Sequence, residues 1–98
     1  MLNESLIINE NIISVRKEEE YLICTKNQNG NCIILVDKTF DRVLDALCEA
    51  RKMLSLIVTG NALKSQTKEA RTYIAQNMYI GKRTKITNIS QIESVEKV

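Results

Sequence analysis

A short turn at residues 59–65 is the strongest candidate for a binding site in this sequence. It reads Thr-Gly-Asn-Ala-Leu-Lys-Ser, which is typical of a strand that ends, a turn at Gly60, and a helix capped by Asn61. Backbone N–H groups at the start of a helix attract phosphate, and Lys64 adds a positive charge in the first turn. A plain strand-to-helix turn explains the same residues, because one glycine falls short of a full P-loop.

Basic residues elsewhere could extend this site. Lys38 follows the preceding predicted strand, and the carboxyl ends of adjacent strands in an α/β sheet open onto the same edge. We therefore expect Lys38 and the Gly60 turn to face one ligand. Lys68 lies one helical turn after Lys64. A further basic group precedes the last predicted strand: Lys82, Arg83 and Lys85. This group is either a separate basic rim or an ordinary solvated surface.

Residues suited to catalysis or metal binding are sparse. The chain has no histidine, which removes the commonest general base and metal ligand. Asp37, Asp41 and Asp45 are spaced by four and could share one side of a helix. A solvated face near a helix N-terminus explains them better, because hard cations usually need six or more oxygen ligands. We therefore predict no catalytic residue, no bound metal and no cofactor.

Composition bounds the class of protein. A chain of 98 residues makes one domain, residues 1–98. With 14 basic and 12 acidic residues, the net charge alone is no argument for nucleic acid. No apolar run approaches the ~20 residues needed to span a bilayer, and the early acid makes a secretory signal unexpected. We expect a protein of the cytoplasm or nucleus that does not bind membranes.

Three cysteines fit a reducing compartment. Cys24, Cys32 and Cys48 are odd in number and widely spaced, and they form no CxxC pair. Reduced thiols are therefore the expectation. A bridge between Cys24 and Cys32 across a hairpin is the alternative.

The first third of the chain predicts short strands. Leu6–Ile8 and Ile12–Val15 are β-branched or apolar segments separated by polar turn formers. Two further segments flank an Asn-Gly step, which readily adopts the positive φ angles of a type I′ turn. We interpret Tyr21–Lys26 and Cys32–Val36 as the two arms of a β-hairpin.

From Ile33 onward the sequence predicts a strand–helix–strand–helix–strand order. The continuous apolar run at 32–36 predicts a central strand covered on both faces. Phe40, Val43, Leu44 and Leu47 then follow the rhythm of an amphipathic helix. The remaining elements are a strand at Leu54–Val58, a helix at Ala62–Asn77, and a last strand after Gly81. Beyond Ile86, a bulged strand and a short helix are both open.

The residues of this second half resemble the Alba superfamily of DNA- and RNA-binding proteins. The stretches that carry the resemblance are Ile34–Leu47, Leu56–Lys64 and the helix at 67–77. Gly60-Asn61-Ala62 stands at the family's Gly-Asn-Ala or Gly-Arg-Ala turn. The resemblance implies an Alba-like βαβαβ core at 33–98, preceded by an N-terminal β-hairpin extension at 1–32. It also implies a homodimer or heterodimer.

The chain departs from the Alba pattern at two places. Where the family has a basic pair after its first strand, this chain has Asp37-Lys38. The family's long C-terminal hairpin arm has no room after Ile89. Either the N-terminal hairpin replaces that arm as the edge of the sheet, or the resemblance is one of architecture alone.

The sequence therefore predicts a small two-layer α/β (α+β) protein, not an enzyme, that binds DNA or RNA through phosphate contacts with little sequence preference. Chromatin, RNA metabolism and a ribonucleoprotein are the settings that the resemblance implies. The expected contacts are Lys38, Gly60, Asn61, Lys64, Lys68, Lys82, Arg83 and Lys85.

Two other functions are kept open. The near-neutral charge and the acidic run at 18–20 favour a protein–protein interaction module or a structural subunit without nucleic-acid binding. A small enzyme or sensor that binds a phosphorylated ligand at the Gly60 turn is the third hypothesis.

Overall fold

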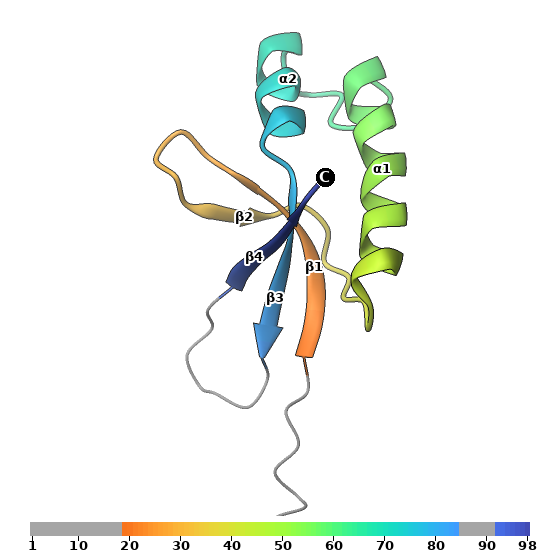
Figure 1. Cartoon of the computed structure of the whole chain (residues 1–98). Helices are drawn as coiled ribbons and strands as arrows, with labels where there is room; N and C mark the ends of the chain where they lie inside the picture. The colour runs from red at the N-terminus through yellow and green to blue at the C-terminus, as the bar shows by residue number, and fades with distance from the viewer. Residues whose placement is uncertain (1–18, 85–91) are drawn as a thin grey trace, which may run out of the picture.

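The computed structural model describes residues 19–84 and 92–98. These ranges form a small α+β domain of four antiparallel strands and two helices (Figure 1). In chain order the elements are β1 (Glu19–Lys26), β2 (Cys32–Ile34), α1 (Val43–Thr59), α2 (Lys68–Gln76), β3 (Tyr79–Thr84) and β4 (Ile92–Lys97). The predictions for Leu6–Ile8, Ile12–Val15, Lys85 and 86–91 lie outside the described residues.

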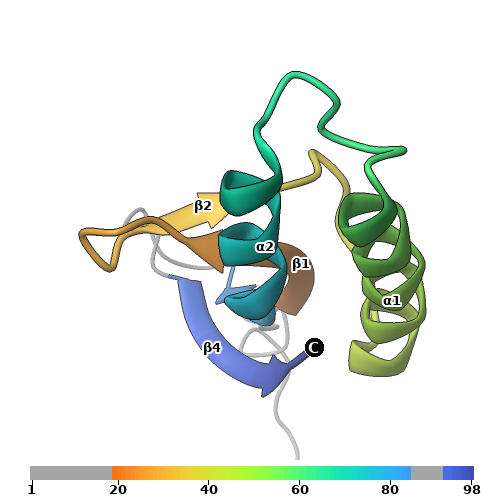
Figure 2. The ribbon, with the colours of Figure 1, turned by 90° about the horizontal axis from the view of Figure 1, so that it is seen from above.

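The sheet has the order β2-β1-β3-β4, so the first and third strands are its interior. β1 and β3 pair along their length, from Glu19 opposite Thr84 to Cys24 opposite Tyr79. Both helices pack on the same face of the sheet, α2 above β1 and α1 beside it (Figure 2). The result is a two-layer structure with one helical layer.

The main core lies between the two layers. Ile23 of β1 and Ile80 of β3 stand opposite each other with no exposed surface. α1 covers them with two alanines, Ala46 and Ala50, and with Ile57, all three fully buried. The small alanine side chains let the helix backbone approach the sheet closely, so the two isoleucines fill the space between the layers.

The predicted strand Leu54–Val58 is wrong, because these residues are the last turns of α1. Leu54 and Ile57 continue the buried stripe that Ala46 and Ala50 begin, at the i, i+4, i+8 and i+11 spacing of a helix face. The β-branched residues Ile57 and Val58 favour a strand by propensity, but packing against the sheet overrides that local preference.

The element order is therefore ββααββ and not the predicted βαβαβ. The hairpin is confirmed, with Cys24 opposite Ile34 and Lys26 opposite Cys32. The expected type I′ turn is wrong, because Gly30 has a positive φ (82°) but Asn29 does not. However, β2 is an exposed edge strand and not the central one. The interior position belongs to β1, which the sequence assigned to the N-terminal extension, and the expected boundary after residue 32 falls inside β2.

Two other boundaries also differ. The second helix begins at Lys68 and not at Ala62, because Thr67 caps it: its Oγ1 accepts a hydrogen bond from the Ala70 N–H (3.1 Å).

Gly81 does not end the helical segment but lies inside β3. A Cβ at Gly81 would collide with the Ile92 side chain of β4 and come within 3.2 Å of the Cys24 Sγ. The close approach of β4 therefore requires a residue without a side chain. After residue 91 the chain forms a strand, which pairs with β3 through a register shift at Ile80/Gly81.

The cysteines are free, and the alternative of a hairpin bridge is wrong. Cys24 and Cys32 occupy diagonal positions of the hairpin, where Cα atoms lie about 7–8 Å apart, too far for a relaxed disulfide. Cys24 is fully buried beside Leu22 and Tyr79 on the face opposite the helices. This burial, followed by the neighbouring Cys32 thiol, raises the pKa of Cys24 from 9.0 to about 12.

The helical assignment of residues 54–58 predicts opposite outcomes for two adjacent alanine substitutions. Ile57→Ala should lower the free energy of unfolding by about 2–5 kcal/mol, because Ile57 is fully buried. Val58→Ala should leave it unchanged or raise it by up to about 0.5 kcal/mol, because Val58 is 60% exposed on a helix that alanine favours. Urea denaturation measures both values. A large loss for Val58→Ala would contradict the helix.

The cysteine environments predict selective alkylation. At pH 8 a maleimide should modify Cys32 and Cys48, which are exposed, and spare Cys24 until the protein unfolds. Intact mass should show two adducts in buffer and three in denaturant; three adducts in buffer would contradict the buried thiol.

Because the pKa of Cys24 is raised on folding, its contribution to stability is complete below about pH 9 and falls as the pH rises toward 12.

Candidate nucleic-acid interface

The Gly60 turn ends α1 instead of starting a helix. Gly60 adopts the left-handed conformation, with φ of 83°, which glycine reaches without strain. The N–H of Gly60 donates to the Ile57 carbonyl (3.2 Å), and the N–H groups of Asn61 and Ala62 donate to the Leu56 carbonyl (2.8 and 3.0 Å). These bonds satisfy the last carbonyls of the helix. The expected helix start at this turn is therefore wrong, because these three N–H groups bond to the end of α1.

Asn61 does not cap a helix either. Its side-chain amide donates to the Thr59 Oγ1 (3.1 Å), within the turn itself. The Thr59 hydroxyl donates in turn to the Ser55 carbonyl (2.9 Å), one turn back along α1. Both side chains are exposed, and both stabilise the end of α1.

Arg71 joins this turn to α2. Its Nε donates to the Ile57 carbonyl and its Nη1 to the Gln66 carbonyl, both at 3.0 Å. A Cβ at Gly60 would lie 3.3 Å from the Arg71 Nη2, so the guanidinium covers the turn closely. A positive charge at the C-terminus of α1 is favourable, because the helix dipole is negative there. Arg71 thus has a structural role at the junction of the helices.

Lys38 and the Gly60 turn lie at opposite ends of α1, so the predicted shared edge of the sheet is wrong. Lys38 precedes α1 and Gly60 follows it, and a helix of this length spans about 25 Å. The Lys38 Nζ instead lies 5.1 Å from the centre of the Phe40 ring, and Phe40 pairs with Tyr21 of β1. The expectation failed because it assumed a parallel sheet with a strand at 54–58.

Lys82 and Arg83 do not form a free basic rim, since acidic residues on neighbouring strands compensate them. Arg83 pairs with Glu20, its Nε donating to the carboxylate at 2.7 Å. The Lys82 Nζ lies 3.7 Å from Glu19 and 3.8 Å from Glu93. The acidic run at 18–20 thus includes the start of β1, where Glu19 and Glu20 compensate the positive charges of β3. Lys85 lies outside the described residues.

Exposed positive charge gathers along the second half of α1, which the sequence prediction left out, and continues to Lys64 and Lys68, which it included. Residues 51–71 contain five basic residues and a single acid, Glu69. Apart from Arg71, the basic side chains are exposed and form no ion pair within ranges 19–84 and 92–98. We call these residues the basic segment: Arg51, Lys52, Lys64 and Lys68.

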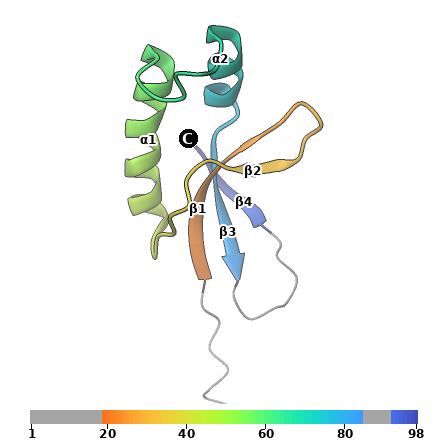
Figure 3. The ribbon, with the colours of Figure 1, turned by 180° about the vertical axis from the view of Figure 1, so that it is seen from behind.

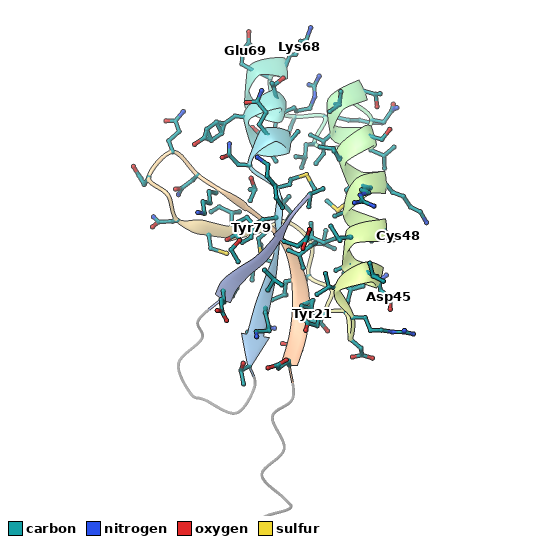
Figure 4. The ribbon with its side chains drawn as sticks, in the orientation of Figure 1. Tyr21, Asp45, Cys48, Lys68, Glu69 and Tyr79 are labelled. Atoms are coloured by element: carbon teal, nitrogen blue, oxygen red, sulfur yellow. The ribbon has the colours of Figure 1, made fainter. Side chains whose placement is uncertain are left out.

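The basic segment occupies the second half of α1, the connection, and the first residue of α2. Figure 4 shows Lys68 and Glu69 at the outer end of α2, directed away from the sheet. Lys64 and Lys68 are exposed, but Lys64 lies in the connection and not in the first turn of a helix, as was expected. Arg51 and Lys52 were missed, although a running count of charge along the chain would have revealed them, because the strand assigned at 54–58 separated them from Lys64.

Metal binding finds no support in the part of the chain that the structure describes. Of the three aspartates spaced by four, only Asp45 lies in α1, since Asp37 and Asp41 precede the helix. Within the described ranges, no group of three or more cysteine or carboxylate side chains could hold a metal ion. Neither described helix is long and apolar enough to cross a membrane.

Comparisons with family models, characterised proteins and solved structures find no match to this chain. The resemblance to the Alba superfamily receives no support from them. The geometry and charge of the chain itself are therefore the basis for a functional proposal.

Substitution of Arg71 should lower the stability of the protein, although Arg71 is not part of the basic segment. Arg71→Gln should lower the free energy of unfolding by about 1.5–3 kcal/mol, because two carbonyls lose a charged donor. The matched variant Arg51→Gln removes the same charge from an exposed site and should change stability by less than about 0.5 kcal/mol. Urea denaturation of both variants tests this. Equal losses of stability in the two variants would contradict the structural role of Arg71 at the junction of the helices.

Proposed function

We propose that this protein binds DNA or RNA through phosphate contacts that depend little on base sequence. The observation that carries the proposal is the basic segment, whose four exposed cations have no acidic partner among the described residues. Mobile, solvated lysines and arginines bind phosphates by releasing condensed counterions, which supplies most of the affinity in non-specific complexes.

The aromatic side chains support contact with the phosphate backbone and not with the bases. Proteins that stack on unpaired bases present exposed aromatic rings. Here Tyr79 is buried, and Tyr21, Phe40 and Tyr73 are partly buried, so the chain has no exposed ring. A charged surface without such a platform favours recognition of the backbone, in which the order of bases has little effect.

The proposal rests on the basic segment and not on the resemblance to the Alba superfamily. The described residues follow a ββααββ order, whereas an Alba-like core requires βαβαβ. Of the contacts that the resemblance implied, Lys64 and Lys68 belong to the proposed surface. Lys38 lies beyond the other end of α1, and Lys82 and Arg83 are paired with acids.

Removing two charges from the basic segment should weaken binding of every sequence to a similar degree. In fluorescence anisotropy with a short duplex and a short RNA, Lys64→Gln/Lys68→Gln should reduce affinity. The plot of log K against log salt should lose about 1.8 of its slope on duplex DNA, about 0.9 for each phosphate contact removed. Neither substitution removes a hydrogen bond of the described fold, so stability should not change.

A double variant at the other end of α1 provides the matched control. Lys38→Gln/Arg42→Gln also removes two exposed charges, and Arg42 loses only a surface pair with Asp45 at 3.8 Å. This control should retain most of the affinity and the slope. An effect as large as that of the first variant would show that the surface is misplaced. Absence of any binding by the unmodified protein at low salt and about 100 µM would refute the proposal.

A further inference from the structure

The two edges of the sheet are protected very differently. β4 carries Glu93, Glu96 and Lys97, and its pairing with β3 is interrupted by a register shift. Charges and irregular pairing of this kind are how sheet edges avoid pairing with other chains. β2 has the sequence Cys-Ile-Ile and is regular, uncharged and exposed throughout. Figure 3 shows β2 at the outer border of the sheet.

Backbone groups of β2 point outward from this border. The Asn27 N–H donates to the Asn31 carbonyl (3.0 Å), and the Leu35 N–H donates to the Ile23 carbonyl (2.9 Å). In an antiparallel pair, bonded and non-bonded residues alternate. Ile33 therefore bonds to β1, while the N–H and C=O groups of Cys32 and Ile34 point away from it. No strand within residues 19–84 and 92–98 pairs with them, so they can bond to a further strand.

An apolar hollow adjoins the same edge on its helical side. It has a volume of about 290 Å³ and lies between the hairpin and α2. Ile33 and Leu35 line it from the hairpin side, and Ala70, Tyr73 and Ile74 line it from α2. Ile33 is 41% exposed at its rim. A strand added beyond β2 would place its helix-side residue next to Ile33, within reach of the hollow.

We propose that β2 pairs antiparallel with β2 of a second copy of this chain, about a two-fold axis at Ile33. Cys32 and Ile34 then exchange backbone hydrogen bonds with Ile34 and Cys32 of the second copy, about four bonds in total. The two Ile33 residues form the close, non-hydrogen-bonded pair on the helical side. Each apolar side chain lies at the rim of the other copy's hollow.

A second copy fits this edge because the edge is self-complementary. A two-fold axis brings identical residues together, which is unfavourable for charged strands and favourable for uncharged apolar ones. β4, with charges at three of its six residues, does not meet this condition. The contact is short, so the dimer belongs to the weak class of interfaces below about 1,200 Å². This inference does not depend on nucleic-acid binding.

The mass of the unmodified protein should increase with its concentration. Sedimentation velocity between about 10 µM and 1 mM, with reductant present, should show a monomer that converts to a dimer. Reductant should have no effect, because the axis places Cys32 opposite Ile34 and not opposite the second Cys32. A monomer throughout this range would overturn the proposal, as would a dimer that reductant abolishes.

Three substitutions locate the interface. Ile34→Pro removes an outward N–H without breaking the β1–β2 ladder, and Ile34→Lys adds a charge at a residue that is 42% exposed. Each should raise the dimer dissociation constant at least about tenfold. Val95→Lys makes the same change on β4 at 40% exposure and should leave dimerisation intact.

Folding and amide exchange are the readouts that keep this test decisive. Circular dichroism checks that each variant is folded. If Ile34→Pro is unfolded, Ile34→Lys alone tests the interface. On dimerisation, the Cys32 and Ile34 amides should become protected from hydrogen exchange, whereas the Ile33 amide should change little. A dimer that survives both Ile34 substitutions, or that Val95→Lys disrupts equally, would overturn the β2 assignment.

Discussion

The pairing of β1 with β3 is the interaction on which the rest of the described structure depends. It joins segments that β2 and both helices separate along the chain, and it sets Ile23 against Ile80 to form the floor of the core. α1 can bury its alanine face only against that floor, and α2 follows from the end of α1. The loop closed by this pairing contains β2 and both helices, so its entropic cost must be met by burial of the whole helical layer.

Some charged residues of the described structure hold its elements together, and others have no structural role. Glu20 of β1 and Arg83 of β3 form a partly buried ion pair, which holds the start of β1 against the end of β3. At the helix junction, Arg71 satisfies two carbonyls and the negative end of α1. The basic segment has no such structural partner among the described residues. A surplus of solvated cations costs self-repulsion, and this is why we propose that the basic segment binds an anionic polymer.

Among the described residues, the uncharged edge at β2 is the other feature without a partner. Exposed backbone donors and acceptors next to an apolar hollow are a hazard in any soluble protein, and the opposite edge shows that this chain uses charge against it. If β2 pairs with a second copy, each assembly carries two basic segments on one body. A long polyanion can then engage both, which strengthens binding through effective concentration without any new type of contact.

The sequence by itself determined the local features of this protein. The Asn-Gly step specified the position of the β1–β2 hairpin, with Gly30 at a φ of 82°. Helical spacing specified a helix in the first half of α1, although Phe40 precedes α1 and Leu44 is 75% exposed. Only the tertiary structure decided which elements are interior. The apolar run at 54–58 is compatible with a strand or a helix, and the interior sheet face selected the helix by burying Ile57. That choice moved Gly60 from the start of a helix to the end of one, and it separated Lys38 from the basic segment. Site residues that depend on long-range packing could not be placed from the sequence, because local periodicity says which face is apolar but not what covers it.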